Sequence, residues 1–575
     1  MKRVYRFLFF WLVGAGLMIW LFAACDGQIP PQETHPTLPS PSQRAAMERE
    51  SHPTLPSPSQ SAAMERESHP TLPSPSQSAA MERESHPTLP SPSQSAAMER
   101  ESHPTLPSPS QSAAMEREET LPHSPLPTSH FSPTAMGTET PRRSHYSFAV
   151  RFDYLAHTLG VTETLVYVNN TSASLTELLV VVEADRREGS FALQGLQWGD
   201  GEPLEDYILE EARLRIPLRQ ALAPYQSLSL HIQYSLDIPF FEAGQVVYGP
   251  LNATARQANL GDWYPYIPPL DAEAGWLVYE PSGVGENQVY DLADFEVNIE
   301  VVDAPPGLVI AASSWGQQAG DRYHFLLEGG RNFAWSASPE YVVAQTVIGS
   351  ALITSYAFPE DARQGQALLQ VSADAVALYN ELFAPYPHTS LAVVESGFFD
   401  GLEYDGLYFL GSEYFAAYSG APTDYLTILG AHETAHQWWY GLVGSDQAWQ
   451  PWLDEALCTY SERLFYERYA PELLPWWWNY RVDRFDPQGA VDSTIYDLAG
   501  FRLYTDAVYL RGARLLEDLR IRVGDEAFFA ALKAYAAREA GRIARPDDFF
   551  AALRAQTGQD FSDIVARYFQ EGSVP

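Results

Sequence analysis

The most informative segment of the sequence is His432-Glu433-Thr434-Ala435-His436, and a second segment, Trp452-Leu453-Asp454-Glu455-Ala456, follows it. Residues four apart lie on one face of a helix, about 6 Å from each other, so His432 and His436 can direct their ring nitrogens at one Zn²⁺ ion. Glu433 would lie beside that ion, where a base that acts on a water molecule must sit.

Glu455 lies 19 residues after His436 and is the candidate third ligand. Two histidines and one carboxylate leave the fourth tetrahedral position open, which is typical of a catalytic zinc site rather than a structural one. Cys458 lies one turn further along, but a fourth protein ligand would close the site, so we expect this cysteine to be a core residue. The pattern predicts one Zn²⁺ per chain, bound by His432, His436 and Glu455.

The residues around this motif have helical periodicity. Apolar residues recur with a period near 3.6 from Leu368 to Leu382, and a second helical pattern begins at Trp452. A short strand is expected at 391–395, with extended chain through Phe409. We therefore expect residues 351–575 to form a mainly helical domain that carries the chemistry.

Residues 143–350 have a different period. Apolar and polar residues alternate at 228–236 and at 295–301, and turn-forming pairs such as Asn169-Asn170 and Gly329-Gly330 separate such runs. These are the patterns of half-buried strands. We expect an antiparallel β-sandwich or saddle domain without a catalytic constellation of its own, and an α+β fold for the whole chain.

Several segments together make the chain similar to one known family. The strings around His432 and Glu455 resemble those of the gluzincin zinc aminopeptidases, the aminopeptidase N family, in which H-E-x-x-H is followed after eighteen residues by the Glu of W-L-N-E-G. The similar segments elsewhere are Phe399-Asp400-Gly401-Leu402-Glu403-Tyr404-Asp405-Gly406-Leu407 (family G-A-M-E-N-x-G-L), Tyr509-Leu510-Arg511-Gly512-Ala513 (family Y-E-K-G-A), Trp263-Tyr264-Pro265, Asp294-Phe295 and Asn332-Phe333-Ala334. The resemblance covers roughly residues 146–575.

The resemblance implies a thermolysin-like catalytic domain after the β domain, and a zinc aminopeptidase that acts on peptides with a free N-terminus. It implies that Glu403 binds the α-ammonium group of the substrate and that Tyr509 donates a hydrogen bond to the developing oxyanion. Both roles are chemically suitable, because a carboxylate pairs with a cation and a phenol stabilises negative charge on oxygen. Glu433 would be the general base.

The sequence also departs from the family pattern. Asp400, Gly401, Leu402 and Tyr404 replace four of the five letters of G-A-M-E-N, and Asp454 replaces an Asn. The chain reaches only to Pro575, so we expect the large helical domain that caps the cleft in longer members to be absent. Two alternatives therefore stay open, a catalytically inactive binding scaffold of the same fold and an endopeptidase.

The N-terminus has the pattern of an export signal. Basic residues precede an uncharged apolar run from Phe7 to Ala24, and the run ends in Phe22-Ala23-Ala24-Cys25, which resembles a bacterial lipobox. We expect residues 1–25 to be a signal peptide and Cys25 to be lipidated. An uncleaved signal anchor is the alternative, since 18 apolar residues can span a bilayer. Both readings predict a membrane-anchored, extracytoplasmic protein, and the first predicts a bacterial lipoprotein.

Residues 26–142 contain a repeat. The string His-Pro-Thr-Leu-Pro-Ser-Pro-Ser-Gln begins at His35 and recurs every 17 residues. Three prolines per copy oppose continuous helix, and one Leu and one Met per copy bury too little apolar surface to form a core. We expect a disordered spacer between the membrane and the folded domains.

Composition excludes one class of function. The net charge is −37, of which residues 143–575 carry −33, so the folded part would repel the phosphates of a nucleic acid. The chain has two cysteines, Cys25 and Cys458, which provide no disulfide framework. We expect no nucleic-acid partner, and an acidic surface that tolerates cationic peptides.

Overall fold

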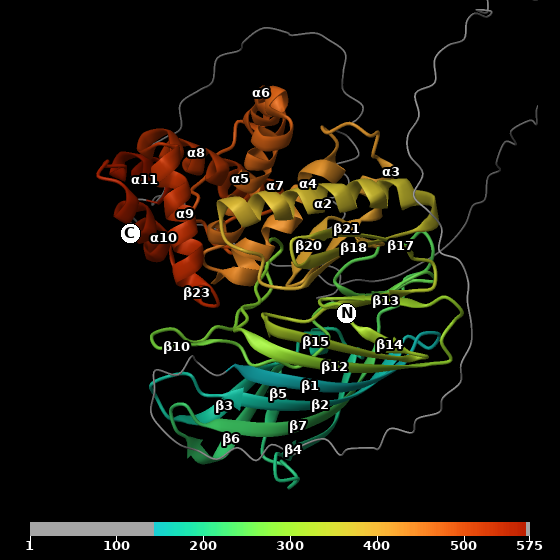
Figure 1. The fold of residues 1–575 in the computed structure, drawn as a ribbon. Coiled ribbons are helices and arrows are strands. Elements are labelled where there is room, and N and C mark those ends of the chain that lie inside the picture. The colour runs from blue at the N-terminus through green and yellow to red at the C-terminus, as the bar shows by residue number, and fades with distance from the viewer. Residues whose placement is uncertain (1–142, 571–575) are drawn as a thin grey trace, which may run out of the picture. The chain divides into compact units, whose positions relative to one another are not determined.

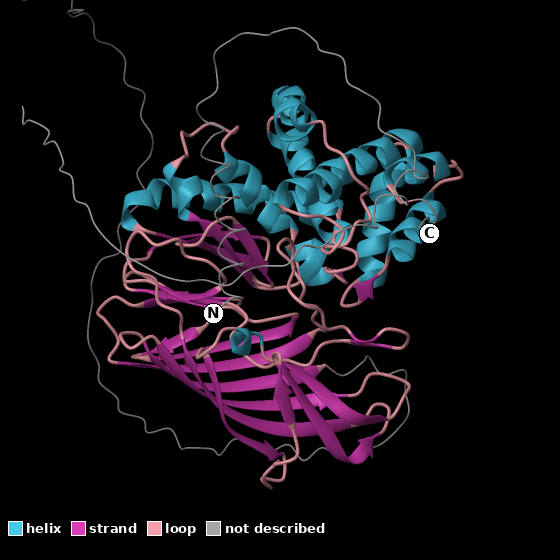
Figure 2. Cartoon of the chain, turned by 180° about the vertical axis from the view of Figure 1, so that it is seen from behind, coloured by secondary structure: helices cyan, strands magenta, loops and turns pink. Residues whose placement is uncertain are grey.

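The computed structural model describes residues 143–570. The predicted signal peptide, Cys25 and the repeats therefore lie outside the described residues. Within the described part, the strands of a large β domain lie on one side and most helices on the other (Figure 1; Figure 2). The predicted α+β fold, with a β-rich region before a helical one, is confirmed.

A seven-stranded sheet forms the base of the β domain, in the order β14-β15-β12-β1-β2-β7-β4. Its neighbouring strands are antiparallel except β1 and β12, which run parallel. The strands are β1 (Ser144–Asp153), β2 (Thr158–Val168), β4 (Phe191–Trp198), β7 (Ser227–Asp237), β12 (Ala293–Val302), β14 (Gln317–Ala319) and β15 (Arg322–Gly330). The two runs whose alternation predicted strands correspond to β7 and β12.

Three smaller sheets complete this domain. Their strands are β3 (Leu175–Val181), β6 (Arg213–Leu222) and β5 (Ile208–Glu210); β13 (Val309–Ala312), β16 (Trp335–Ser338), β9 (Ala258–Leu260) and β8 (Leu251–Ala253); and β10 (Leu270–Asp271) with β11 (Gly275–Trp276). Inward-facing residues of the sheets form one apolar core, in which rings such as Tyr146, Trp263 and Phe295 pack together.

Glu163 is an exception in this core. Its side chain lies on β2 opposite Phe148 and is fully buried, and neither carboxylate oxygen has a hydrogen-bond partner among the described residues. Burial raises the pKa of Glu163 well above its ordinary value. The hydroxyl groups of Tyr234 and Tyr264, which are also buried, likewise lack a partner in the described part of the chain.

A five-stranded sheet opens the catalytic region, in the order β17-β18-β19-β21-β20. Its strands are β17 (Val342–Ile348), β18 (Ala351–Ala357), β19 (Ser390–Ser396), β20 (Gly401–Tyr404) and β21 (Leu407–Gly411). Because β17 and β18 pair as a hairpin, the expected domain boundary at residue 350 falls inside one sheet. β20 lies at one edge of the sheet, opposite β17, and among the described strands it pairs with β21 alone.

Helices cover this sheet and extend beyond it (Figure 1). The long helix α2 (Ala362–Leu382) confirms the predicted 3.6-residue period, and its apolar face packs in the catalytic core. The others are α3 (Ser412–Ala416), α4 (Tyr425–Ala435), α5 (Trp452–Tyr469), α6 (Leu474–Trp477), α7 (Phe501–Tyr504), α8 (Arg511–Val523), α9 (Asp525–Glu539), α10 (Pro546–Gln556) and α11 (Ser562–Tyr568), and the short strands β22 (Gly444–Ser445) and β23 (Ile543–Ala544) pair between them. Among the described residues, no helix is both long and apolar enough to span a membrane.

Arg331 joins the β domain to the catalytic region. Its side chain is 2% exposed and donates hydrogen bonds to main-chain carbonyl oxygens of Tyr290, Tyr440, Gly441 and Arg542. Its main-chain N–H donates to Asp405 Oδ2 at 2.9 Å. The charge of this buried guanidinium is thus satisfied by groups from several separate segments.

Candidate active site

Two helices bring the predicted metal ligands together. His432 and His436 lie at the end of α4, and Glu455 lies in the first turn of α5. One ligand atom from each of the three residues lies within 4.8 Å of the others, and His432 Nε2 is 3.2 Å from Glu455 Oε2. The donor set of two imidazoles and a carboxylate is one that Zn²⁺ prefers. The spacing predicted from the sequence is therefore realised in three dimensions.

Each histidine is oriented by a carboxylate on its other ring nitrogen. His432 Nδ1 lies 2.9 Å from Glu462 Oε1, and His436 Nδ1 lies 2.6 Å from Asp454 Oδ1. Such contacts fix the ring tautomer that leaves Nε2 free to bind a metal. Sequence reasoning missed both roles, although Glu462 lies seven residues after Glu455, and thus on the same face of α5.

Arg481 completes the support on the Glu462 side. Its guanidinium donates two hydrogen bonds of 2.9 Å to the Glu462 carboxylate. On the other side, Gln447 Nε2 donates to Asp454 Oδ2 at 2.9 Å and to Glu403 Oε1 at 3.2 Å. The ligand histidines are thereby held by buried networks that extend well beyond the metal ligands.

The electrostatics of the site favour a cation. Burial lowers the pKa of His432, but hydrogen bonds to Glu455 and Glu462 more than offset this and raise it to about 9. Burial also raises the pKa of Glu433 to about 7 and that of Glu403 to about 8, with further contributions from neighbouring carboxylates. A pocket with this excess of carboxylates is suited to Zn²⁺, and the residues present therefore fit the ion.

Glu433 lies where the motif predicts a base. Its Oε2 atom is buried and has no hydrogen-bond partner among the described residues. Glu403, Glu433 and His436 also offer ligand atoms within 4.8 Å of one another, so the predicted ammonium-binding carboxylate adjoins the predicted base. An unpaired acceptor at this position can take a proton from a molecule bound in the site.

Tyr509 also lies in the site, where its ring contacts the candidate metal ligand His432. Its ring stacks on His432 with centroids 5.9 Å apart and planes 7° apart. The neighbouring Tyr504 packs against it edge-on, with ring centroids 5.6 Å apart. The ring contact with His432 places the Tyr509 phenol beside the candidate metal ligands.

Glu286 is a further residue near the site that sequence reasoning missed. It belongs to the β domain, in the segment between β11 and β12, and it interacts electrostatically with Glu403, Glu455 and Asp454. Gly285, beside it, has no room for a side chain because Ile495 and Tyr504 lie against its backbone. The expectation that the β domain has no catalytic constellation of its own is compatible with this single residue, and a lone loop carboxylate has no sequence pattern that could have shown its position.

Cys458 is buried behind the site, as expected. Its Sγ atom is 3.9 Å from Asp454 Oδ1 and 3.9 Å from Trp439 O. With His436 and Asp454 it forms a second set of potential ligand atoms. This second set lies on the side of His436 that is hydrogen-bonded to Asp454. It is therefore separate from the first set, in which His436 is grouped with His432 and Glu455.

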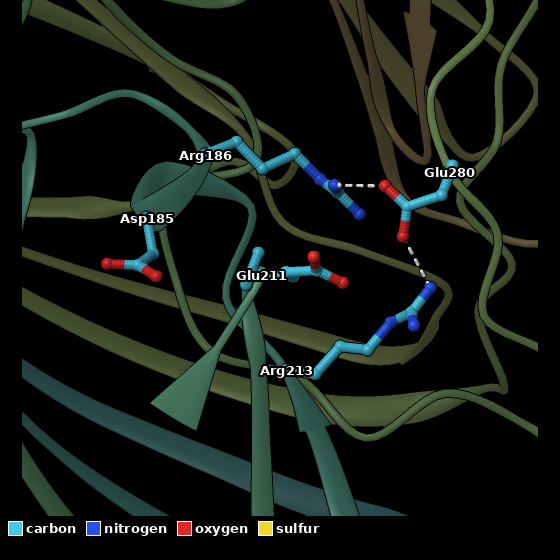
Figure 3. Close-up of a pocket in the computed structure, with 6 residues that line it drawn as sticks. Asp185, Arg186, Glu211, Arg213 and Glu280 are labelled. Carbon is cyan, nitrogen blue, oxygen red and sulfur yellow. Dashed lines mark hydrogen bonds and ion pairs between the residues drawn. The ribbon is translucent and has the colours of Figure 1, made fainter. Parts of the chain in front are cut away.

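A surface pocket in the β domain is unrelated to these residues. It is lined by Asp185, Arg186, Glu211, Ala212, Arg213 and Glu280 (Figure 3). Arg186 and Arg213 both pair with Glu280, at 3.0 and 2.5 Å, so the two guanidinium groups already have a counter-ion. None of the predicted site residues lines this pocket.

Comparison with known proteins identifies the catalytic region. Residues 369–568 match the model for the peptidase family M1 domain. These residues form a family M1 domain. The gluzincin, aminopeptidase N-like resemblance drawn from the motifs is thereby confirmed, and the M1 domain contains all the candidate site residues except Glu286.

Individual relatives are similar over part of the chain. Aminopeptidase M1 of Arabidopsis thaliana is 27% identical over 231 residues, which are 37% of this chain and 26% of that protein. Aminopeptidase N of Streptomyces lividans is 31% identical over 161 residues, 26% of this chain and 18% of that protein. The alignments with these curated relatives thus span about a quarter or less of their length.

The fold also has a solved counterpart. A structure of an M1 zinc metallopeptidase from Deinococcus radiodurans superimposes with a TM-score of 0.53 at 18% identity. The match covers 76% of this chain and 96% of that one. The β domain and the M1 domain described here therefore occur together in a known fold.

Proposed function

We propose that this protein is a zinc-dependent aminopeptidase that removes N-terminal residues from peptides. The observation that carries the proposal is the convergence of ligand atoms from His432, His436 and Glu455, with the unpartnered carboxylate oxygen of Glu433 beside them. The relatives named above are aminopeptidases by description, and a variant of the Deinococcus metallopeptidase was solved with a Tyr-Ser-Ala substrate. These similarities support a peptide as the substrate.

In this proposal the chain's own residues carry the proton transfers and the binding steps. His432, His436 and Glu455 would hold Zn²⁺, which would supply Lewis acidity toward the scissile carbonyl and the attacking water. Glu433 Oε2 accepts the proton of the water and returns it to the leaving amine. Tyr509 donates a hydrogen bond from its phenol to the oxyanion that develops at the carbonyl oxygen.

Recognition of the peptide N-terminus is assigned to the acidic end of the site. Glu403 accepts a hydrogen bond from Gln447, and Glu286 of the β domain interacts with it electrostatically. Carboxylates that interact in this way repel each other, and a cation bound beside them removes that cost. An α-ammonium group is such a cation, so the pair favours substrates with a free N-terminus.

The test uses zinc analysis and fluorogenic aminoacyl amides. We expect one Zn²⁺ per chain and hydrolysis that Glu433→Gln abolishes while zinc is retained. Protein that binds no zinc, or activity that survives in the Glu433→Gln variant, would contradict the proposal. If the protein is an inactive scaffold, it will contain no zinc or will not hydrolyse these amides.

A second experiment separates an aminopeptidase from an endopeptidase. N-acetylation of the substrate should prevent cleavage, and Glu403→Ala should raise KM for the free-amine substrate at least tenfold. Cleavage of acetylated peptides at an undiminished rate would instead identify an endopeptidase.

We further propose that the chain is exported and held at the outer side of a membrane by a lipid on Cys25. The support is the sequence of residues 1–25, with its basic start, apolar run and lipobox-like end. Expression in a bacterium with a labelled fatty acid should give labelled protein in the membrane fraction, and Cys25→Ser should abolish the label. Unlabelled protein that stays membrane-bound would favour the uncleaved anchor.

A further inference from the structure

An exposed apolar surface lies next to the edge strand β20. Val246, Tyr248 and Phe399 are 46%, 48% and 50% exposed, respectively. Val247 and Phe398 form a parallel β-bridge, and both are buried. Because side chains alternate along extended chains, the three exposed residues lie on the same outer face of this pair. We call Val246, Tyr248 and Phe399 the apolar patch.

The patch is continuous with the candidate active site through the backbone. Gly401 lies against Glu433, since a Cβ added there would overlap the carboxylate. Phe399 precedes Gly401 by two residues, and Glu403 follows it by two. From Glu403 back to Phe399, the chain therefore passes from the ammonium-binding carboxylate, through Gly401 beside the general base Glu433, to the apolar patch.

The turn between Gly401 and Phe399 is held in place. Asp400 has a left-handed backbone, with φ of 74°, which aspartate tolerates better than most residues. Its N–H donates to Glu413 Oε1 at 2.9 Å, and its Oδ1 accepts from Tyr414 Oη at 3.0 Å and from the Gly401 N–H at 3.1 Å. Phe399 is therefore presented outward from a fixed turn.

We infer that the apolar patch binds the second and third residues after the scissile bond and favours apolar side chains there. The inference rests on the proposed aminopeptidase function, which places the N-terminus at Glu403 and the scissile bond at Glu433. A peptide that lies along the β20 edge then continues past Gly401 toward Phe399. Each residue of extended peptide advances about 3.3 Å, so one or two residues bring it to the patch.

The test compares tetrapeptides that share their first two residues, Leu-Ala, and end in Leu-Leu or in Ser-Ser. We expect kcat/KM of the unmodified protein to be on the order of tenfold higher for the Leu-Leu peptide. Phe399→Ser and Tyr248→Ser should each reduce this preference at least threefold, mainly through KM. Ile521→Ser, at a residue of α8 that is 73% exposed, is the matched control and should leave the preference unchanged.

A leucyl fluorogenic amide has no residues beyond the leaving group. It therefore tests the proposed aminopeptidase function separately from the inference about the apolar patch. Its kcat/KM should change less than twofold in both patch variants. Failure of the unmodified protein to cleave this amide would contradict the aminopeptidase function itself. Cleavage of the amide without any Leu-Leu preference, or a preference that both variants retain, would overturn the inference alone.

A second copy of the chain is the competing occupant of the patch. In that case Phe399→Ser would lower the mass found by sedimentation and leave the peptide preference unchanged, which would also overturn the inference.

Discussion

The carboxylate of Glu433 fills the space that a side chain at Gly401 would need. Oε1 and Cδ of Glu433 both lie within overlap distance of a Cβ built at this glycine. Gly401, which departs from the family's G-A-M-E-N pattern, therefore leaves room for Glu433, the proposed general base. A larger residue could be accommodated only if Glu433 moved.

Gly401→Ala should thus reduce kcat on the order of 100-fold, because a shift of about 1 Å in a catalytic group has this effect. Zinc content should be retained, since the three atoms nearest to a Cβ at Gly401 all belong to Glu433, which is not one of the proposed ligands. Kinetics on the leucyl amide provide the measurement. Gly558→Ala, where a Cβ meets nothing within 4 Å, is the control. A kcat within twofold of the original would show that Glu433 adapts freely.

Asp454→Asn should weaken zinc binding by about 10- to 100-fold. The reason is that Asp454 Oδ1, 2.6 Å from His436 Nδ1, is a charged acceptor that increases the basicity of the ligand. Competition with a chelator at fixed pH measures the affinity, and Asp321→Asn on the exposed surface serves as the control. Unchanged affinity would mean that the amide, which is usual in the family, orients His436 equally well.

Tyr509→Phe should lower kcat by about 10²- to 10³-fold and leave KM and zinc content nearly unchanged, because the lost donor acts on the transition state. Tyr504→Phe is a close control, since the Tyr504 hydroxyl is buried without a hydrogen-bond partner among the described residues. A larger loss of kcat in Tyr504→Phe than in Tyr509→Phe would indicate that Tyr504 is the donor.

Cys458→Ala should keep one Zn²⁺ per chain, with chelator affinity within about threefold. The thiol lies on the Asp454 side of His436, away from the ligand set that includes Glu455. Metal analysis after dialysis tests this expectation. Loss of zinc would indicate that Cys458 is a fourth protein ligand. It would then occupy the coordination position that must stay open for hydrolysis.

Glu163→Gln should stabilise the protein above about pH 5 and change its stability little at pH 4. The pKa of Glu163 is raised in the folded state, whereas an unfolded glutamate titrates near pH 4.3. Between these two values the folded state holds a proton that the unfolded state has released, so stability falls by about 1.4 kcal/mol per pH unit as the pH rises. The glutamine variant has no such proton to release.

Urea unfolding of both proteins at pH 4 and pH 8 measures this difference. The gain in unfolding free energy caused by Glu163→Gln should be larger at pH 8, while Glu188→Gln, at an exposed position, should show no pH-dependent gain. An equal effect at the two pH values would mean that Glu163 titrates normally.

Local patterns predicted much of the fold. The 3.6-residue period revealed α2, and the two-residue alternation revealed β7 and β12, because burial of one face imposes these periods directly. The parallel pairing of β1 with β12 was not predictable, since the strands are far apart in sequence and their alternation does not specify a partner. The expected domain boundary at residue 350 separated β17 from β18 for a similar reason. Strands of adjoining sheets have the same alternating pattern.

The candidate site was predicted to the extent that its residues lie in motifs. His432, Glu433, His436 and Glu455 have spacings that the helix geometry requires, and the structure brings them together. Glu286 reaches the site only through long-range packing of a loop, and Arg481 only through the path of the chain after α6. Contacts of that kind depend on the tertiary fold and have no local signal.

Arg331 has a consequence for how the protein unfolds and moves. Its guanidinium binds carbonyl oxygens from both the β domain and the M1 domain, so separating the two would leave a buried cation without its acceptors. We expect the two regions to melt in a single calorimetric transition. We then expect the β domain and the M1 domain not to rotate relative to each other about a hinge at Arg331. Substrate entry would depend on movements of side chains and loops instead.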